Sequence, residues 1–199
     1  MIPADAVLPL WLKIAYTVFV LILVAIYLKH WGAGNFLWFS DIALFGTLLA
    51  LWLESSFVAS MMAISVLLPE VVWNVGFFGR LLTGRNVGSL AAYMFDPGKP
   101  LYVRALSLFH VFLPVLLVWL IYKPGYAVHA WIAQTLLACI VLPLTYLLTD
   151  RTENVNWVHG PSSKPQAVMP ARLYLLLVML FFPLFVYLPT HLILRALFG

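Results

Sequence analysis

Three ionisable side chains interrupt apolar runs that are long enough to cross a membrane: Asp41, Glu70 and His110. A charged side chain at the bilayer centre costs roughly 2.5–3.5 kcal/mol, so each of them needs a partner or a function. At 1.5 Å per helical residue, they lie roughly 9, 15 and 12 Å from the same side of the membrane. The spacing therefore predicts one polar pocket in one half of the bilayer. A neutral histidine can accept or relay a proton, which makes His110 the first candidate for catalysis.

Further polar residues share helix faces with these three. Residues three or four positions apart on a helix point the same way. The candidates are Trp73 and Asn74 beside Glu70, and Arg104 and Ser107 on the face of His110. We expect Glu70, Trp73, Asn74 and Arg104 to line the pocket and to bind a substrate.

The densest polar stretch of the chain, residues 149–160, follows the fifth apolar run. It is predicted to lie at the mouth of the same half of the membrane. Asp150, Asn154 and His159 are its candidate substrate-binding residues. A solvated helix end is the alternative interpretation of Asp150.

Other uses of these residues stay open. Interhelical hydrogen bonds that only stabilise the bundle are one, and a proton or ion path is another. A metal site is a third, because His, Glu and Asp are suitable ligands. No pair has a diagnostic spacing, such as two histidines one helical turn apart. We therefore predict no metal and no cofactor.

The composition identifies the solvent that surrounds the chain. Of its 199 residues, 64% are hydrophobic and 9% are charged, whereas soluble domains have roughly 45–50% and 25%. We expect an all-α, polytopic membrane protein with a single domain, 1–199. About 20 apolar residues cross the hydrocarbon core, and six such helices are predicted: 7–28, 36–53, 56–78, 102–122, 127–148 and 173–197.

The basic residues suggest an orientation and exclude one class of partner. Eight of the eleven Lys and Arg lie on the side of the two long loops: Lys29, Arg80, Arg85, Lys99, Arg104, Arg151, Lys164 and Arg172. Cytoplasmic loops carry the excess of Lys and Arg, so we predict outside termini and a pocket in the cytoplasmic leaflet. In a bacterium this would be the inner membrane. Since the basic residues are scattered and form no cluster, no nucleic-acid partner is expected.

Three short segments carry a resemblance to a known family. They are Asn35-Phe36-Leu37-Trp38-Phe39-Ser40-Asp41, Ser107-Leu108-Phe109-His110-Val111-Phe112-Leu113-Pro114, and Asn156-Trp157-Val158-His159. In order and type they resemble the androgen-induced transmembrane hydrolases, six-helix membrane proteins that cleave fatty-acid esters of hydroxy fatty acids. The resemblance implies a lipid substrate and a catalytic role for His110. The family's nucleophilic Thr is not matched: Trp38 stands at its position, and Ser40 and Asp41 are the nearby candidates for the nucleophile.

Two functions follow from the sequence. The first is a membrane-embedded lipid hydrolase or acyltransferase with His110, Ser40 and Asp41 as catalytic residues. The second is a non-catalytic membrane subunit or a small transporter that binds membrane lipid, an ion or a partner protein. A hydroxyl nucleophile needs its base within about 3 Å. The distance between His110 and Ser40 or Asp41 therefore separates the two.

Overall fold

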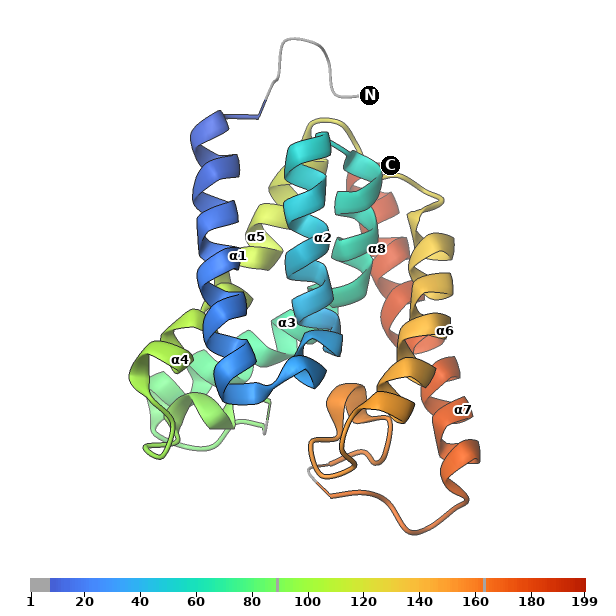
Figure 1. Ribbon diagram of the computed structural model, residues 1–199. Coiled ribbons are helices and arrows are strands. Elements are labelled where there is room, and N and C mark those ends of the chain that lie inside the picture. The colour runs from blue at the N-terminus through green and yellow to red at the C-terminus, as the bar shows by residue number, and fades with distance from the viewer. Residues whose placement is uncertain (1–7, 89, 163) are drawn as a thin grey trace.

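The protein is a bundle of helices that pass back and forth along one axis (Figure 1). The structure, a computed structural model, describes residues 8–88, 90–162 and 164–199, and these contain helices but no strand. The passes are α1 (Leu10–Trp31), α2 (Phe39–Leu53), α3 (Ser56–Thr83), α4 (Leu101–Leu106) with α5 (Phe109–Tyr122), α6 (Ala130–Leu148), and α7 (Ala171–Phe181) with the π-helix η4 (Phe182–Tyr187) and α8 (Leu188–Phe198). Five of the six passes are long and apolar enough to span a membrane. The prediction of an all-α membrane bundle is confirmed.

The outer surface of the bundle suits lipid. Large apolar side chains point outward along its length, among them Leu21, Val115 and Leu147, which are 63%, 69% and 73% exposed. Water would oppose such a surface, whereas hydrocarbon does not. The chain is therefore a multi-pass membrane protein.

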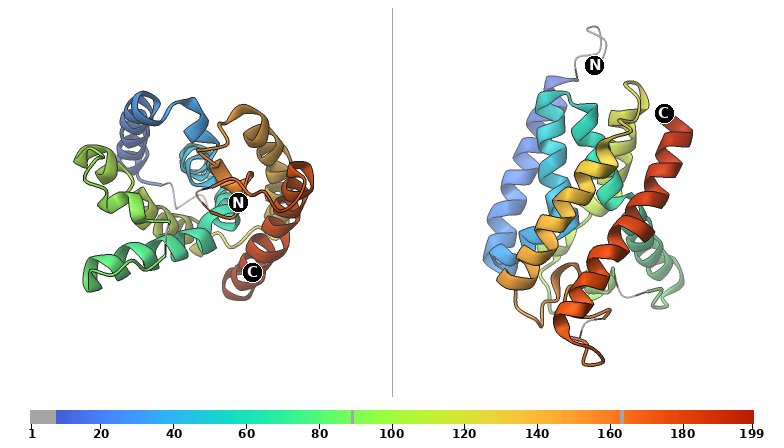
Figure 2. Two further views of the ribbon diagram at one scale, coloured as in Figure 1. Left: turned by 90° about the horizontal axis from the view of Figure 1, so that it is seen from below. Right: turned by 90° about the vertical axis from the view of Figure 1, so that its right-hand side faces the viewer.

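The two ends of the bundle differ (Figures 1 and 2). The start of α1 and the C-terminus lie together at one end, which we call the terminal end. The long connections 84–100 and 149–170 lie at the other, which we call the loop end. The first predicted span began at Val7, which lies outside the described residues; α1 itself begins at Leu10.

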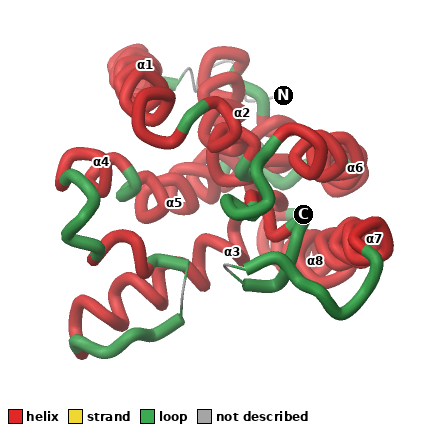
Figure 3. The backbone as a smooth tube through the Cα atoms, turned by 60° about the horizontal axis from the view of Figure 1, so that its bottom comes forward, coloured by secondary structure: helices red, strands yellow, loops and turns green. Residues whose placement is uncertain are grey.

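Helix α3 is the centre of the packing. It contacts α2, α5, α6 and the last pass, and Figure 3 shows it running to the middle of the bundle between α5 and α8. The Ser55 hydroxyl caps its start by accepting a hydrogen bond from the amide of Val58, and Gly84 ends it in the left-handed conformation. The helix continues through Pro69 and reaches Thr83, five residues beyond the predicted end.

Helix α2 is shorter than the predicted span because the chain breaks before it. Residues Ala33–Leu37 form a separate 3₁₀ turn, η1, and Trp38 is extended (φ −58°, ψ 137°). The 15-residue helix is therefore only about 22 Å long. The break places Ser40 and Asp41 in the first helical turn, where the helix dipole favours an anion.

Candidate functional site

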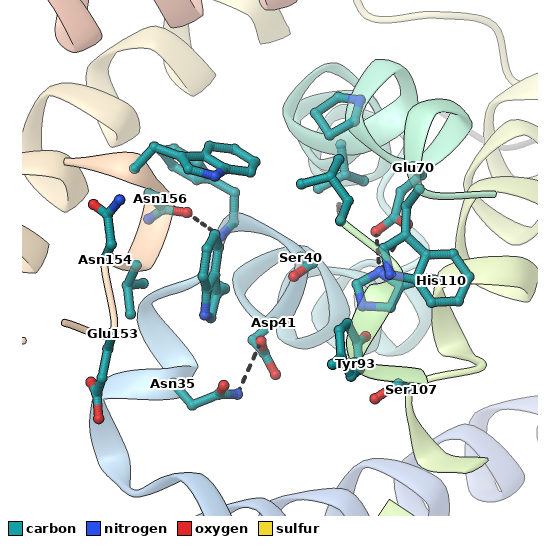
Figure 4. Close-up of a pocket in the computed structure, with 18 of the residues that line it drawn as sticks. Asn35, Ser40, Asp41, Glu70, Tyr93, Ser107, His110, Glu153, Asn154 and Asn156 are labelled. Atoms are coloured by element: carbon teal, nitrogen blue, oxygen red, sulfur yellow. Dashed lines mark hydrogen bonds and ion pairs between the residues drawn. The ribbon is translucent and has the colours of Figure 1, made fainter. Parts of the chain in front are cut away.

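A cavity of about 590 Å³ opens at the loop end of the bundle. Its walls come from α1, the start of α2, the middle of α3, the start of α5, the connection before α4, the loop after α6 and η4 (Figure 4). Six of the predicted site residues line it: Ser40, Asp41, Glu70, Trp73, His110 and Asn154. The structure thus brings together five residues from three helices, which the sequence predicted to meet in one half of the membrane, and Asn154 from the loop after α6.

His110 and Glu70 form the central pair of the cavity. The imidazole Nδ1 lies 2.8 and 2.9 Å from the two carboxylate oxygens of Glu70. The Glu70 side chain is only 2% exposed, and that of His110 13%. The oxygens of an ionised Glu70 can only accept hydrogen bonds, and with Glu70 in that form Nδ1 carries the proton and donates it. The lone pair of the ring is then on Nε2, in the arrangement of a general base that a carboxylate orients.

Aromatic rings and an amide hold this pair in place. Trp73 stacks on the imidazole with the ring centroids 4.7 Å apart, and Phe109 stacks on it at 4.1 Å. The side-chain amide of Asn74 donates to the carbonyl oxygens of Glu70 (2.8 Å) and His110 (2.7 Å). Asn74 therefore does not line the cavity; it joins α3 to α5 and fixes the two partners relative to each other.

Asp41 is deeply buried and only half satisfied. It is 3% exposed, and its Oδ2 accepts a hydrogen bond from the side chain of Asn35 at 3.3 Å. Its Oδ1 is buried and has no hydrogen-bond partner. Such a group is costly in an apolar interior unless a ligand or water binds it.

The expected contact between nucleophile and base is not formed. Ser40 and Asp41 line the same cavity as His110 (Figure 4), but no hydrogen bond joins either of them to the imidazole. Ser40 and Asp41 directly follow η1 and the extended Trp38, and this break in the helix does not follow from hydrophobic periodicity. The hypothesis of a Ser40 or Asp41 nucleophile therefore gains no direct support from the geometry.

Three other predicted residues lie outside the cavity lining. Arg104 donates to the backbone carbonyls of Met94 (2.9 Å) and Lys99 (3.1 Å), which orders the loop before α4. Asp150 is exposed and accepts hydrogen bonds from Thr152, which lower the pKa of its carboxyl. Both side chains stabilise the loop end, and neither lines the cavity.

His159 is the third of these residues. It is 5% exposed and packs on Tyr146, with ring centroids 4.8 Å apart, and both of its ring nitrogens are buried without a partner. Burial lowers its pKa, and the charge of Arg151 lowers it further. A neutral, enclosed imidazole in this place has a packing role.

The loop after α6 is held by two asparagines. Asn154 donates to the carbonyls of Gly160 (2.8 Å) and Ser162 (2.6 Å) and accepts from the amide of His159. Asn156 accepts from the amide of Phe39 (3.0 Å) and donates to the carbonyl of Leu37 (2.7 Å). The second set of bonds caps the start of α2 from a distant part of the chain.

The backbone of this loop is strained where it borders the cavity. Asn154, Asn156 and Trp157 have positive φ angles of 46°, 51° and 56°. Asparagine adopts this conformation readily, whereas a bulky residue such as Trp157 rarely does. Strain of this kind is concentrated at functional sites, and the paired asparagines were its only signal in the sequence.

Sequence reasoning missed two tyrosines of the cavity wall. The hydroxyl of Tyr27 on α1 lies 2.6 Å from Oγ of Ser107. Tyr93 comes from η2 (Ala92–Phe95), and burial raises the pKa of its phenol. Neither residue interrupts an apolar pattern, so only the fold reveals them.

The described residues contain no group of three or more His, Cys, Asp or Glu side chains placed to hold a metal ion. Comparison with models of known families, with curated proteins and with solved structures finds no match to this chain. The fold and the site define a multi-pass membrane protein in which a half-buried histidine and a buried glutamate form a pair in a cavity.

Proposed function

We propose that the protein is a membrane-embedded enzyme that hydrolyses or transfers the acyl group of a lipid ester, with His110 as the general base. The observation that carries the proposal is the hydrogen bond between His110 Nδ1 and Glu70, which leaves Nε2 of a half-buried, cavity-lining imidazole available as the base. The resemblance to the androgen-induced hydrolases adds the expectation of a lipid ester.

In this reaction Nε2 takes the proton from a water molecule or from the hydroxyl of an acceptor. The oxygen then attacks the ester carbonyl carbon, the bond to the alcohol oxygen breaks, and the departing oxygen takes the proton back from the imidazolium. Glu70 orients the ring and stabilises its positive charge, as the carboxylate of a catalytic triad does. Trp73 and Asn74 are positioning residues, since they touch His110 and Glu70.

Water or an acceptor hydroxyl is the nucleophile that this geometry favours. Ser40 has no hydrogen bond to His110, but it lines the same cavity. The Ser40 hydroxyl would attack in place of water if substrate binding moved this hydroxyl to about 3 Å from Nε2 of His110. Such catalytic contacts often tighten only in the complex with the substrate. Single-turnover experiments with Ser40→Ala separate these routes, because a serine nucleophile would leave an acyl-enzyme in the wild type.

The orientation of the bundle in the membrane is part of the same proposal. The eight-to-three distribution of Lys and Arg favours a cytoplasmic loop end, with the termini outside. The cavity then opens toward the cytoplasmic leaflet. Reporter fusions after Gly199 and at Ser162 measure this, and a cytoplasmic signal at Gly199 would move the site to the outer leaflet.

The reaction is tested on purified protein in nanodiscs with a panel of lipid esters. We expect the wild type to release or transfer fatty acid, and His110→Ala and His110→Gln to lose at least a hundredfold in rate. The melting temperature should change little in His110→Gln, whose amide can still donate to Glu70, and fall in His110→Ala, which leaves the buried carboxylate without a partner. His129→Ala is the matched control, because His129 is an exposed histidine at the terminal end. Full activity of His110→Gln would contradict a base and leave only a hydrogen-bonding role.

A second candidate is a non-catalytic protein that binds a lipid, an ion or a membrane partner in the same cavity, as a subunit or a small transporter does. The specific observation that favours it is the missing hydrogen bond between His110 and either Ser40 or Asp41. Under this alternative the wild type binds its ligand without turnover of any ester in the panel.

A further inference from the structure

The cavity is aromatic and has more acidic than basic side chains in its lining. Nine aromatic side chains and three carboxylates, those of Asp41, Glu70 and Glu153, line it together with the single lysine Lys99. Aromatic faces attract cations, and the attraction grows when water is excluded. The lining therefore favours a positively charged ligand over an anion.

One wall already holds an ammonium group. The Nζ atom of Lys99 lies 3.7 Å from the centroid of the Trp31 ring, and both residues line the cavity. The protein itself thus shows that this wall accommodates an alkylammonium by cation–π contact.

Asp41 supplies a specific acceptor within the cavity. Both carboxylate oxygens of Glu70 are engaged by His110, whereas Oδ1 of Asp41 is buried without a partner. Figure 4 shows Asp41 beside Ser40, across the open space from His110 and Tyr93. A buried carboxylate oxygen needs a hydrogen-bond donor, and the N–H of a protonated amine supplies both the donor and the opposite charge.

We propose that the substrate carries a protonated amine, whose N–H donates to Oδ1 of Asp41 while its methylene groups contact the aromatic walls. This deepens the proposed function and rests on it: the lipid ester has an alkylammonium head group of the ethanolamine type. A free alkylammonium shares the same chemistry. A choline group has no N–H and leaves Asp41 unsatisfied.

The test measures binding to detergent-solubilised full-length protein by titration calorimetry. The probe is a short-chain phosphatidylethanolamine whose ester bonds are replaced by ether bonds, so that it cannot be cleaved. We expect it to bind about tenfold or more tightly than the matched phosphatidylglycerol or phosphatidylcholine, as one charged hydrogen bond predicts. This preference should disappear in Asp41→Asn and persist in Asp96→Asn, which alters an exposed carboxylate at the same end.

Two further measurements are made. One identifies whether the amine belongs to a lipid or to a soluble molecule, and the other distinguishes the amine site from the proposed ester chemistry. Free ethanolamine that binds as tightly as the lipid identifies a soluble amine, and weaker binding identifies the lipid; each supports the amine site. Because the ether lipid is not a substrate, its binding does not depend on turnover, and His110→Ala should retain it. Equal affinity of the wild type for the ethanolamine and glycerol lipids would overturn the inference without any variant, and so would an unchanged preference in Asp41→Asn.

Discussion

The two ends of the bundle differ in whether their buried polar groups have hydrogen-bond partners. At the terminal end, Lys13 forms an ion pair with Glu54 at 2.5 Å, and the hydroxyl of Tyr126 bonds Nδ1 of His191 at 2.7 Å. At the loop end, Oδ1 of Asp41 and Nε1 of Trp73 are buried without partners, and both residues line a cavity. Oε1 of Gln134 and the ring nitrogens of His159 are also buried without partners, but neither residue lines the cavity. Asp41 and Trp73 are therefore the unpartnered groups that are placed to bind a ligand there.

The largest effect that this comparison predicts concerns Glu70→Gln. The neutral amide keeps the size of the side chain but no longer stabilises a positive imidazole. We expect kcat for the lipid ester to fall by about 10²–10⁴-fold, as for the loss of a triad carboxylate. Steady-state kinetics measure the rate, and circular dichroism measures the melting temperature.

Tyr126→Phe at the terminal end is the matched control for Glu70→Gln. It removes one buried hydrogen bond, to His191, so the free energy of unfolding should fall by about 1 kcal/mol while activity stays at the wild-type level. Loss of activity in Tyr126→Phe, or full activity in Glu70→Gln, would contradict the functional difference between the two ends.

Helix α3 shows most clearly which features could be predicted from the sequence. Apolar length predicted its position, and the i, i+3, i+4 pattern placed Glu70, Trp73 and Asn74 on one face, where the structure shows all three around His110. Depth in the membrane also brought Asp41 to the same cavity. Helical geometry fixes both relations before any tertiary contact forms.

The roles of the loop residues could not be predicted in this way. Arg104 and His159 have suitable chemistry for a site. The structure shows instead that Arg104 donates to two loop carbonyls and that His159 packs on Tyr146. The start of α2 follows the extended Trp38, and its capping depends on Asn156, 117 residues away from Phe39. Such contacts come from the fold as a whole and have no periodic signature in the sequence.

A smaller effect is expected for Asn156→Ala. The substitution removes two hydrogen bonds, to Leu37 and Phe39, and leaves the amide at the start of α2 without its cap. The free energy of unfolding should fall by about 1–2 kcal/mol, the usual loss for a helix N-cap. Chemical denaturation in mild detergent measures it, and an unchanged stability would show that the loop does not hold α2.

The smallest effect concerns pH and His159. Burial holds its pKa below the ordinary value, so the folded protein binds this proton less readily than the unfolded chain. The contribution of the neutral His159 to the free energy of unfolding is therefore complete above the pKa of the unfolded chain, roughly 6.5. It decreases as the pH falls toward the lower pKa of the folded protein. Melting temperatures recorded from neutral to acidic pH should show a steeper acid-side decline for the wild type than for His159→Gln; parallel curves would contradict the assignment.

The central claim is that Glu70 keeps the proton of His110 on Nδ1 and leaves Nε2 as the base. Nitrogen-15 NMR of histidine-labelled protein at neutral pH, with the His110 signals assigned by their absence in His110→Gln, reads this tautomer directly. The structure predicts a protonated Nδ1 and an unprotonated Nε2, and loss of that fixed tautomer in Glu70→Gln. A neutral ring with its proton on Nε2 in the wild type would contradict the account.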